Sequence, residues 1–122
     1  LRADRVRLEQ VFLNLLTNAR HALSQVTERS LFLHSRYRPD AVLPVEVEVR
    51  DTGPGFDPAE AELLFTPFHS TKAPGAGTGL GLSISLNIVR GNGGRIEASG
   101  ETGRGAAFLV RLPLEARDAE GS

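Results

Sequence analysis

The segment PGAGTGLGLS, residues 74–83, carries a glycine at every second position: Gly75, Gly77, Gly79 and Gly81. Each glycine inside a helix or strand costs up to about 1 kcal/mol relative to alanine, so the segment does not predict regular secondary structure. The residues that follow, 80–90, do predict a helix. A glycine-rich approach to a helix presents bare backbone N–H groups at the positive end of the helix dipole, which suits phosphate, and Thr78 adds a hydroxyl donor.

Two other phosphate-binding patterns do not fit this segment. It lacks the GxxxxGK[ST] pattern of a P-loop, and its glycines do not follow a strand that opens a βαβ unit, so the dinucleotide fingerprint also fails. Taken alone, the segment is equally compatible with a flexible loop rich in small residues. The rest of the chain has to decide between these two interpretations.

The composition limits the classes of function. A chain of 122 residues suggests one domain, which buries roughly two-thirds of its unfolded surface. With 14 basic and 15 acidic residues the net charge is -1, which offers no electrostatic footprint for nucleic acid. The absence of cysteine excludes cysteine redox chemistry and cysteine-based zinc sites. No apolar run approaches the roughly 18 residues of a membrane span, so we expect no membrane contact by this domain.

The chain begins directly in a helical pattern, LRADRVRLEQ, and we therefore expect it to be part of a longer protein. Residues 1–115 are predicted to form the domain. The polar tail at residues 116–122 is expected to be disordered.

Hydrophobic periodicity predicts the order helix, strand, strand, helix, helix, strand, strand. Residues 4–25 carry apolar side chains at three- and four-residue spacing, as an amphipathic helix does, with Asp4 as its N-cap candidate. Residues 45–50, VEVEVR, alternate strictly and predict a half-buried strand. The other predicted elements are a strand at 30–38, a short helix at 57–65 capped by Asp57, a helix at 80–90, and a hairpin formed by 94–99 and 106–113.

This order groups helices with helices and strands with strands, so it does not require a parallel sheet. We predict an α+β fold, a two-layer α/β sandwich in which about three helices cover one face of a mixed, mainly antiparallel sheet.

A row of polar side chains follows one flank of the first predicted helix. Gln10, Asn14 and Asn18 stand four residues apart, and His21 extends the row. Two amides on successive turns can offer carbonyl oxygens to one hard cation such as magnesium, which prefers oxygen ligands. A plain polar helix face is the favoured interpretation of this row alone. Asparagine is a mediocre helix former, however, so helix propensity does not explain two of them in this row.

The segment DTGPG, residues 51–55, breaks the chain where the alternating strand ends. A carboxylate at the end of a buried strand, here Asp51, can accept a hydrogen bond from an exocyclic amine. Gly53 and Gly55 would let a flat ring lie close to the backbone. An ordinary Asp-Gly turn is the alternative.

In this order, the three features resemble the ATP-binding catalytic domain of bacterial sensor histidine kinases, over roughly residues 4–113. The superfamily also contains type II topoisomerases, a heat-shock chaperone family and mismatch-repair ATPases, and it implies the Bergerat ATP-binding fold. Five segments are similar to the family's motifs: LEQVFLNLLTNARHAL (8–23) to the asparagine box, DTGPGF (51–56) to the first glycine box, LFTPFHSTK (64–72) to the phenylalanine box and the start of the ATP lid, GTGLGLSI (77–84) to the second glycine box, and GRGAAFLVRLP (103–113) to the last box.

The resemblance implies roles for individual residues. Asn18 would be the magnesium ligand, with Asn14 as a second candidate, and Lys72 in the lid could reach the γ-phosphate. Asp51 would accept a hydrogen bond from the adenine amino group. The remaining nucleotide-binding candidates are His21, Gly53, Gly55, Phe65, Thr71, Gly77, Thr78, Gly79, Leu80 and Gly81.

Several of these candidates have plain alternatives, which stay open. His21 would also fit a solvated polar face, Phe65 the core and Lys72 the solvent. Two positions depart from the family pattern, Asn92 in place of a frequent histidine and Ala106 in place of a frequent threonine. Neither is expected to touch the assigned chemistry.

The resemblance further implies binding of ATP and Mg2+ and transfer of the γ-phosphoryl group to a histidine on a separate dimerisation segment. Asn14 stands where ATP-hydrolysing relatives carry a glutamate that activates water, and an amide cannot act as a general base. None of His21, His34 and His69 has the helical setting of an acceptor, so we expect no self-phosphorylation by this fragment.

Further expectations concern the parent protein and the lid. A response regulator is the other expected partner, through the full-length protein, and a cytoplasmic location is expected even if the parent is membrane-anchored. Only about eleven residues separate Phe65 from Gly77, and this short lid resembles the nitrogen-regulation subfamily.

Two functions of other classes stay open on the sequence. One is a nucleotide-sensing module that binds ATP or ADP and signals without transfer, which Asn18 and Asp51 would serve equally well. The other is an ATP-driven clamp like the chaperones, against which Asn14 argues.

Overall fold

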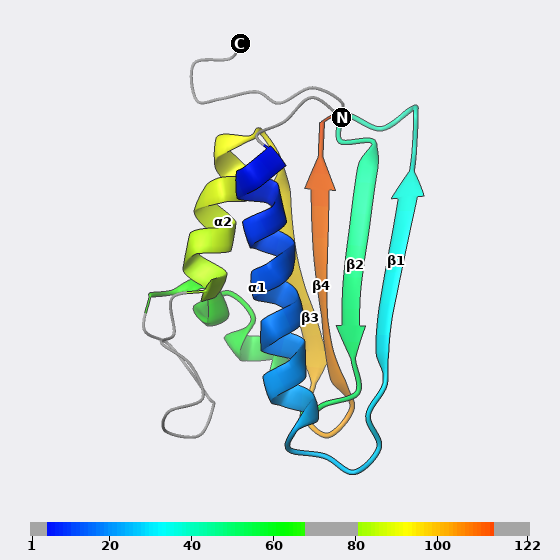
Figure 1. Cartoon of the computed structure of the whole chain (residues 1–122), viewed down its shortest axis with the longest axis vertical. Helices are drawn as coiled ribbons and strands as arrows, with labels where there is room; N and C mark the ends of the chain where they lie inside the picture. The colour runs from blue at the N-terminus through cyan, green and yellow to red at the C-terminus, as the bar shows by residue number, and fades with distance from the viewer. Residues whose placement is uncertain (1–4, 68–80, 114–122) are drawn as a thin grey trace.

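The structure is a computed structural model that describes residues 5–67 and 81–113. Within these residues, two α-helices lie against one face of a four-stranded sheet (Figure 1). The elements are α1 (Arg5–Leu23), β1 (Leu31–Tyr37), β2 (Val45–Asp51), the short 3-10 helices η1 (Pro58–Glu60) and η2 (Leu63–Phe65), α2 (Gly81–Gly91), β3 (Arg95–Glu101) and β4 (Gly105–Leu112).

The sheet has the strand order β1-β2-β4-β3, and all three pairings between the described strands are antiparallel. The predicted α+β sandwich is therefore confirmed. The register places Asp51 of β2 opposite Ala106 of β4, and Val49 opposite Phe108. Because side chains alternate between faces, these four residues point to the helix-covered side of the sheet.

The short helix predicted at 57–65 is instead two separate 3-10 turns. Asp57 caps the first turn as predicted, because its side chain accepts a hydrogen bond from the Ala59 backbone N–H at 3.0 Å. The backbone bonds that follow span three residues, from Ala61 N–H to the Pro58 carbonyl and from Thr66 N–H to the Leu63 carbonyl. A segment this short gains too few helical bonds to offset the cost of nucleation. The Asp4 cap predicted for the first helix lies outside the described residues.

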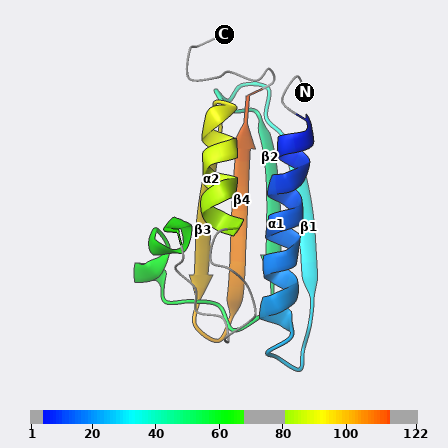
Figure 2. The same cartoon turned by 60° about the vertical axis from the view of Figure 1, so that its left-hand side comes forward.

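The core lies between the helices and the sheet (Figure 2). The predicted apolar stripe of α1 is buried, and it packs against the inner faces of β2 and β4 and against α2. Phe65 of η2 meets Phe108 of β4 edge to face, with ring centroids 6.4 Å apart. The fully or nearly buried members are Leu8, Val11, Leu15, Ala19, Val49, Val89, Ile96, Phe108, Val110 and Leu112.

Outside the core, the edge strand β1 is exposed and the outer face of the sheet carries charged side chains. All seven residues of β1, an edge strand beyond the helices in Figure 1, are exposed to solvent. The face opposite the helices carries ion pairs across three strands, with Arg111 of β4 paired to Glu46 of β2 at 3.4 Å and to Glu97 of β3 at 3.0 Å. In the described part of the chain, no helix has both the length and the hydropathy to cross a bilayer.

Candidate functional site

Asp51 is the most deeply buried acidic residue of the described structure, with 2% of its surface exposed. Its Oδ1 accepts a hydrogen bond from the Gly53 backbone N–H at 2.9 Å. Burial raises the pKa of this carboxyl, and hydrogen bonds from the backbone of Gly53 and Ala106 oppose the rise. A buried carboxyl with a perturbed pKa that faces a cavity is a typical mark of a functional site.

The turn after Asp51 is held tightly between α1 and the β3–β4 hairpin. Gly55 has a φ of +68°, and a Cβ added to it would lie 2.2 Å from the Glu101 carbonyl oxygen. A Cβ added to Gly53 would lie 2.8 Å from the Cβ of Ala22 on α1. The hairpin is tied to the same turn, since the Gly103 backbone N–H donates to the Pro54 carbonyl at 2.7 Å. Close packing by itself therefore accounts for both glycines.

A cavity of about 240 Å³ opens beside this turn, and segments far apart in sequence line it. Three predicted site residues, Asn18, Asp51 and Gly55, come together there. The cavity has apolar walls and few polar groups, which is usual for small-molecule sites. Its lining residues are Asn18, Ala22, Gln25, Asp51, Pro54, Gly55, Phe56, Leu64, Leu82, Thr102, Ala106 and Phe108.

Other predicted site residues lie beside this cavity or are directed elsewhere. Gly53 supports Asp51 through its backbone N–H and is not among the lining residues. Asn14 is directed at the start of α2, where its Nδ2 donates to the Gly81 carbonyl oxygen and to Ser85 Oγ, both at 3.2 Å. His21 is half-buried on α1 and also does not line the cavity.

Part of the predicted site cannot be placed. Thr71, Lys72, Gly77, Thr78, Gly79 and Leu80 lie outside the described residues, so their roles stay predictions. Gly81 is described and forms the first residue of α2. Among the described residues, the nearest neighbours of a Cβ added to Gly81 would be two atoms of the Asn14 side chain at 3.9 Å, which is an ordinary contact distance.

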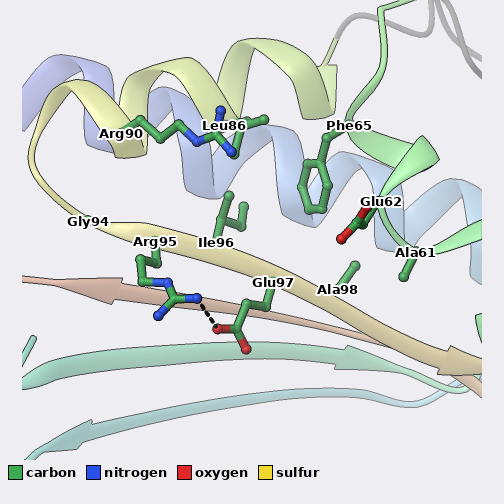
Figure 3. Close-up of a pocket in the computed structure, with 10 residues that line it drawn as sticks. All are labelled: Ala61, Glu62, Phe65, Leu86, Arg90, Gly94, Arg95, Ile96, Glu97 and Ala98. Carbon is green, nitrogen blue, oxygen red and sulfur yellow. Dashed lines mark ion pairs between the residues drawn. The ribbon is translucent and has the colours of Figure 1, made fainter.

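Phe65 lines a different and larger groove, of about 620 Å³, between α2, η2 and β3. Figure 3 shows its ring between α2 and β3, with Leu86 and Ile96 nearby. The rim carries charges of both signs, including an ion pair between Arg95 and Glu97 at 3.7 Å. The neighbouring Leu64 lines the Asp51 cavity instead. The larger groove holds no buried charged group, so the smaller cavity with its buried carboxyl is the better candidate site.

Several lining residues were missed at the level of sequence. Ala106 was not expected to touch the assigned chemistry, but the β2–β4 register places it opposite Asp51 and in the cavity wall. Phe56 directly follows the glycine turn, and its ring occupies the space where a Cβ on Gly100 would lie, at 2.7 Å. Thr102 belongs to the hairpin turn and carried no sequence signal.

Whether the candidate site could hold magnesium depends on the metal-ligating side chains that it offers. Among the described residues, no group of three or more histidine, aspartate or glutamate side chains could hold a metal ion by itself. Magnesium often binds through one or two protein oxygens, several waters and the phosphates of a substrate. A lone amide oxygen from Asn18 is compatible with that second kind of site, which needs a phosphate-bearing ligand to be complete.

Comparison with known proteins agrees with this chemistry. The family model described as "Histidine kinase-, DNA gyrase B-, and HSP90-like ATPase" matches residues 3–116. The chain is 45% identical over 121 residues to the two-component sensor PprA of Pseudomonas aeruginosa, and the match covers 95% of this chain and 13% of that protein. The chain therefore spans only a small part of that relative.

Solved structures show the same fold. A mycobacterial sensor histidine kinase, MprB, superimposes with a TM-score of 0.77 at 27% identity, covering 93% of this chain and 74% of the other. Full-length ShkA, solved in complex with AMPPNP, gives a TM-score of 0.73 at 31% identity, covering 93% of this chain and 22% of the other.

Proposed function

Because the chain belongs to the histidine kinase-, DNA gyrase B- and HSP90-like ATPase family, we propose that it binds Mg-ATP and donates the γ-phosphoryl group to a histidine of its parent sensor kinase. The observation that carries this proposal is the cavity in which the buried carboxyl of Asp51 and the amide of Asn18 meet. Residues 1–115 would form this catalytic domain.

The Asp51 cavity suits an adenine base. Its volume of about 240 Å³ lies below the roughly 300–1,000 Å³ that hold a whole drug-sized ligand, so it accommodates a base and leaves a triphosphate outside. The apolar side chains of Leu82 and Phe108 line it and can contact a flat ring. Asp51 can accept a hydrogen bond from an exocyclic amine, which adenine has at position 6 and guanine lacks there. Asp51 would therefore select adenine.

The phosphate side of the site would lie between Asn18 and the start of α2. Magnesium, when bound, supplies positive charge that neutralises the phosphates. Asn18 would hold the ion through its amide oxygen, and the backbone N–H groups at the start of α2 would face the phosphates. The other proposed contacts come from motif resemblance: His21, Gly53, Gly55, Phe65, Thr71, Lys72, Gly77, Thr78, Gly79, Leu80 and Gly81.

The remaining parts of the reaction would belong to a longer protein. The acceptor histidine would lie on a separate dimerisation segment, and a response regulator would take the phosphoryl group onward. The parent would hold this domain in the cytoplasm. The complex of ShkA with AMPPNP, an ATP analogue, supports ATP as the ligand here.

Calorimetric titration with AMPPNP, with and without magnesium, tests the site. We expect binding that magnesium strengthens in the wild type and that Asn18→Ala loses. Thr17→Ala changes an exposed neighbour on α1 that does not line the cavity, and it should bind as the wild type does. Equal, magnesium-dependent binding by Asn18→Ala would remove Asn18 from the site.

Base selection and transfer need two further measurements. Asp51→Ala should lose the preference for adenine over guanine nucleotides that the wild type shows. Fusion of the chain to the dimerisation helices of a sensor kinase, followed by labelled ATP, should place the label on a histidine. Binding without any labelled histidine would favour a nucleotide-sensing module.

A further inference from the structure

Ser85 is a polar residue in an apolar setting. It lies on α2 with none of its surface exposed, on the side of the helix that faces α1. Serine forms helices less well than alanine, and a buried hydroxyl costs free energy unless it is hydrogen-bonded. Alanine would fill a purely structural position here at lower cost, so the hydroxyl calls for an explanation.

The hydrogen bonds of Ser85 fix the orientation of Asn14. Ser85 Oγ donates its proton to the Gly81 carbonyl oxygen at 2.8 Å, so toward Asn14 it can only accept. The Gly81 carbonyl can also only accept. Asn14 must therefore turn its Nδ2 toward both groups, which lie at 3.2 Å, and its Oδ1 the other way. There, Oδ1 accepts a hydrogen bond from Gln10 Nε2 at 2.8 Å.

These four residues, Gln10, Asn14, Gly81 and Ser85, form what we term the amide brace. It joins the middle of α1 to the first residue of α2. Both the Nδ2 group and the Oδ1 atom of Asn14 are hydrogen-bonded within the brace. Asn18 lies one turn further along α1 and lines the Asp51 cavity. The brace therefore sets the distance between the helix that carries Asn18 and the backbone at the start of α2.

We propose that Ser85 is a positioning residue, which holds Asn14 as a brace between α1 and α2 and so aligns Asn18 with the phosphate-binding end of α2. The proposal rests on the proposed function, because it concerns the phosphate side of that site. In this arrangement Asn14 is not a magnesium ligand, and Asn18 alone supplies the amide oxygen to the metal. The adenine side of the site, around Asp51, shares no member with the brace.

The test compares AMPPNP with magnesium against adenosine, which has the base and no phosphate. Ser85→Ala should weaken AMPPNP binding roughly three- to tenfold, the size expected for one buried hydrogen bond, and leave adenosine binding within about twofold. Asn87→Ala, an exposed change on the same helix, should alter neither. Unchanged AMPPNP binding, or an equal loss for adenosine, would overturn the proposal.

The Asn14→Asp variant distinguishes a role of Asn14 in the amide brace from a role as a magnesium ligand. A carboxylate cannot donate to the Gly81 carbonyl, so the brace predicts that Asn14→Asp weakens AMPPNP binding at least as much as Asn14→Ala does. A magnesium ligand at this position predicts the reverse, because a carboxylate binds the ion more strongly than an amide. Magnesium-dependent binding that is as strong as in the wild type, or stronger, in Asn14→Asp would overturn the proposal.

A measurement without nucleotide tests the brace itself. In urea unfolding, the loss for Asn14→Ala combined with Ser85→Ala should be smaller than the sum of the two single losses, because both changes remove the Asn14–Ser85 hydrogen bond. Additive losses would contradict the brace. A wild type that binds neither AMPPNP nor adenosine would instead refute the proposed function, and the alignment role of Ser85 with it.

Discussion

The glycine turn after β2 and the glycine that begins α2 differ in how far the fold itself requires glycine. At Gly55 a Cβ would lie 2.2 Å from the Glu101 carbonyl oxygen, in a backbone conformation with φ of +68° that side chains disfavour. At Gly81 the nearest atoms among the described residues would be 3.9 Å away. The described part of the fold therefore demands glycine in the first region and leaves room for alanine in the second, where the proposed phosphate contact would give glycine a reason.

The largest of the expected effects is a loss of stability at Gly55, and its absence would contradict the difference between the two regions. Gly55→Ala combines a left-handed backbone with overlap against backbone atoms that cannot move away, and it should cost roughly 3 kcal/mol or more of unfolding free energy. Urea unfolding measures the loss. Gly91→Ala is the matched control, since a Cβ on Gly91 would meet no described residue within 4 Å. Similar stability of the two variants would mean that packing does not set the glycine turn.

Gly81→Ala should show the opposite behaviour, with an intermediate effect. Folding stability should stay equal or rise by up to about 1 kcal/mol, because alanine is the better helix former and space is available. Binding of AMPPNP should weaken about tenfold, since the methyl group would crowd the N–H groups proposed to meet the phosphates. Calorimetry on the two proteins checks this. Undiminished binding would leave the glycine at this position without a ligand-based reason.

The smallest expected effect is the pH dependence that Asp51, at the start of the first region, gives to stability and binding. Burial raises the pKa of Asp51 in the folded state above the ordinary value of 3.8. Between pH 3.8 and the raised pKa, the folded protein therefore binds more protons than the unfolded one. The contribution of Asp51 to stability is then fully present below 3.8 and is lost as pH rises through the raised pKa. Binding of adenine nucleotides should move the other way and strengthen a fewfold over the same window, because the ionised carboxylate accepts hydrogen bonds better.

Asp51→Asn supplies the control for both pH trends. It removes the titrating proton and keeps an oxygen that can accept the bond from Gly53. Unfolding curves and AMPPNP titrations across this pH range should then lose the part of the dependence that belongs to Asp51. A dependence identical to that of the wild type would assign the trend to other groups.

Much of the fold could be predicted from the sequence because its periodic signals are strong. The apolar stripe at 4–25 became α1, and the alternation of VEVEVR became β2, which continues through Asp51. The resemblance to sensor-kinase domains was confirmed by the family match over residues 3–116. The prediction failed at 57–65, where a cap and a proline signal a helical start but give no information on whether the helix propagates.

The site was predictable only where residues stand in local motifs. Asn18, Asp51 and Gly55 were each read from their own segment, and the fold brings them to one cavity. Ala106 and Thr102 enter that cavity through strand register and hairpin position, which local patterns do not specify. The row of amides on α1 likewise predicted a shared face. It could not reveal that Asn14 finds its partners on α2, since that depends on which residue of α2 lies across the helix contact.

The exposed edge strand β1 has a consequence for local motion in the molecule. All of its residues contact solvent, so its separation from β2 would expose little apolar surface and should occur well below the free energy of global unfolding. Leu31 of β1 pairs with the backbone of Asp51, whereas the Asp51 side chain is held by Gly53 and Ala106. Amides along this edge would thus exchange with deuterium early, while the hydrogen bonds from Gly53 and Ala106 keep the Asp51 carboxyl in place.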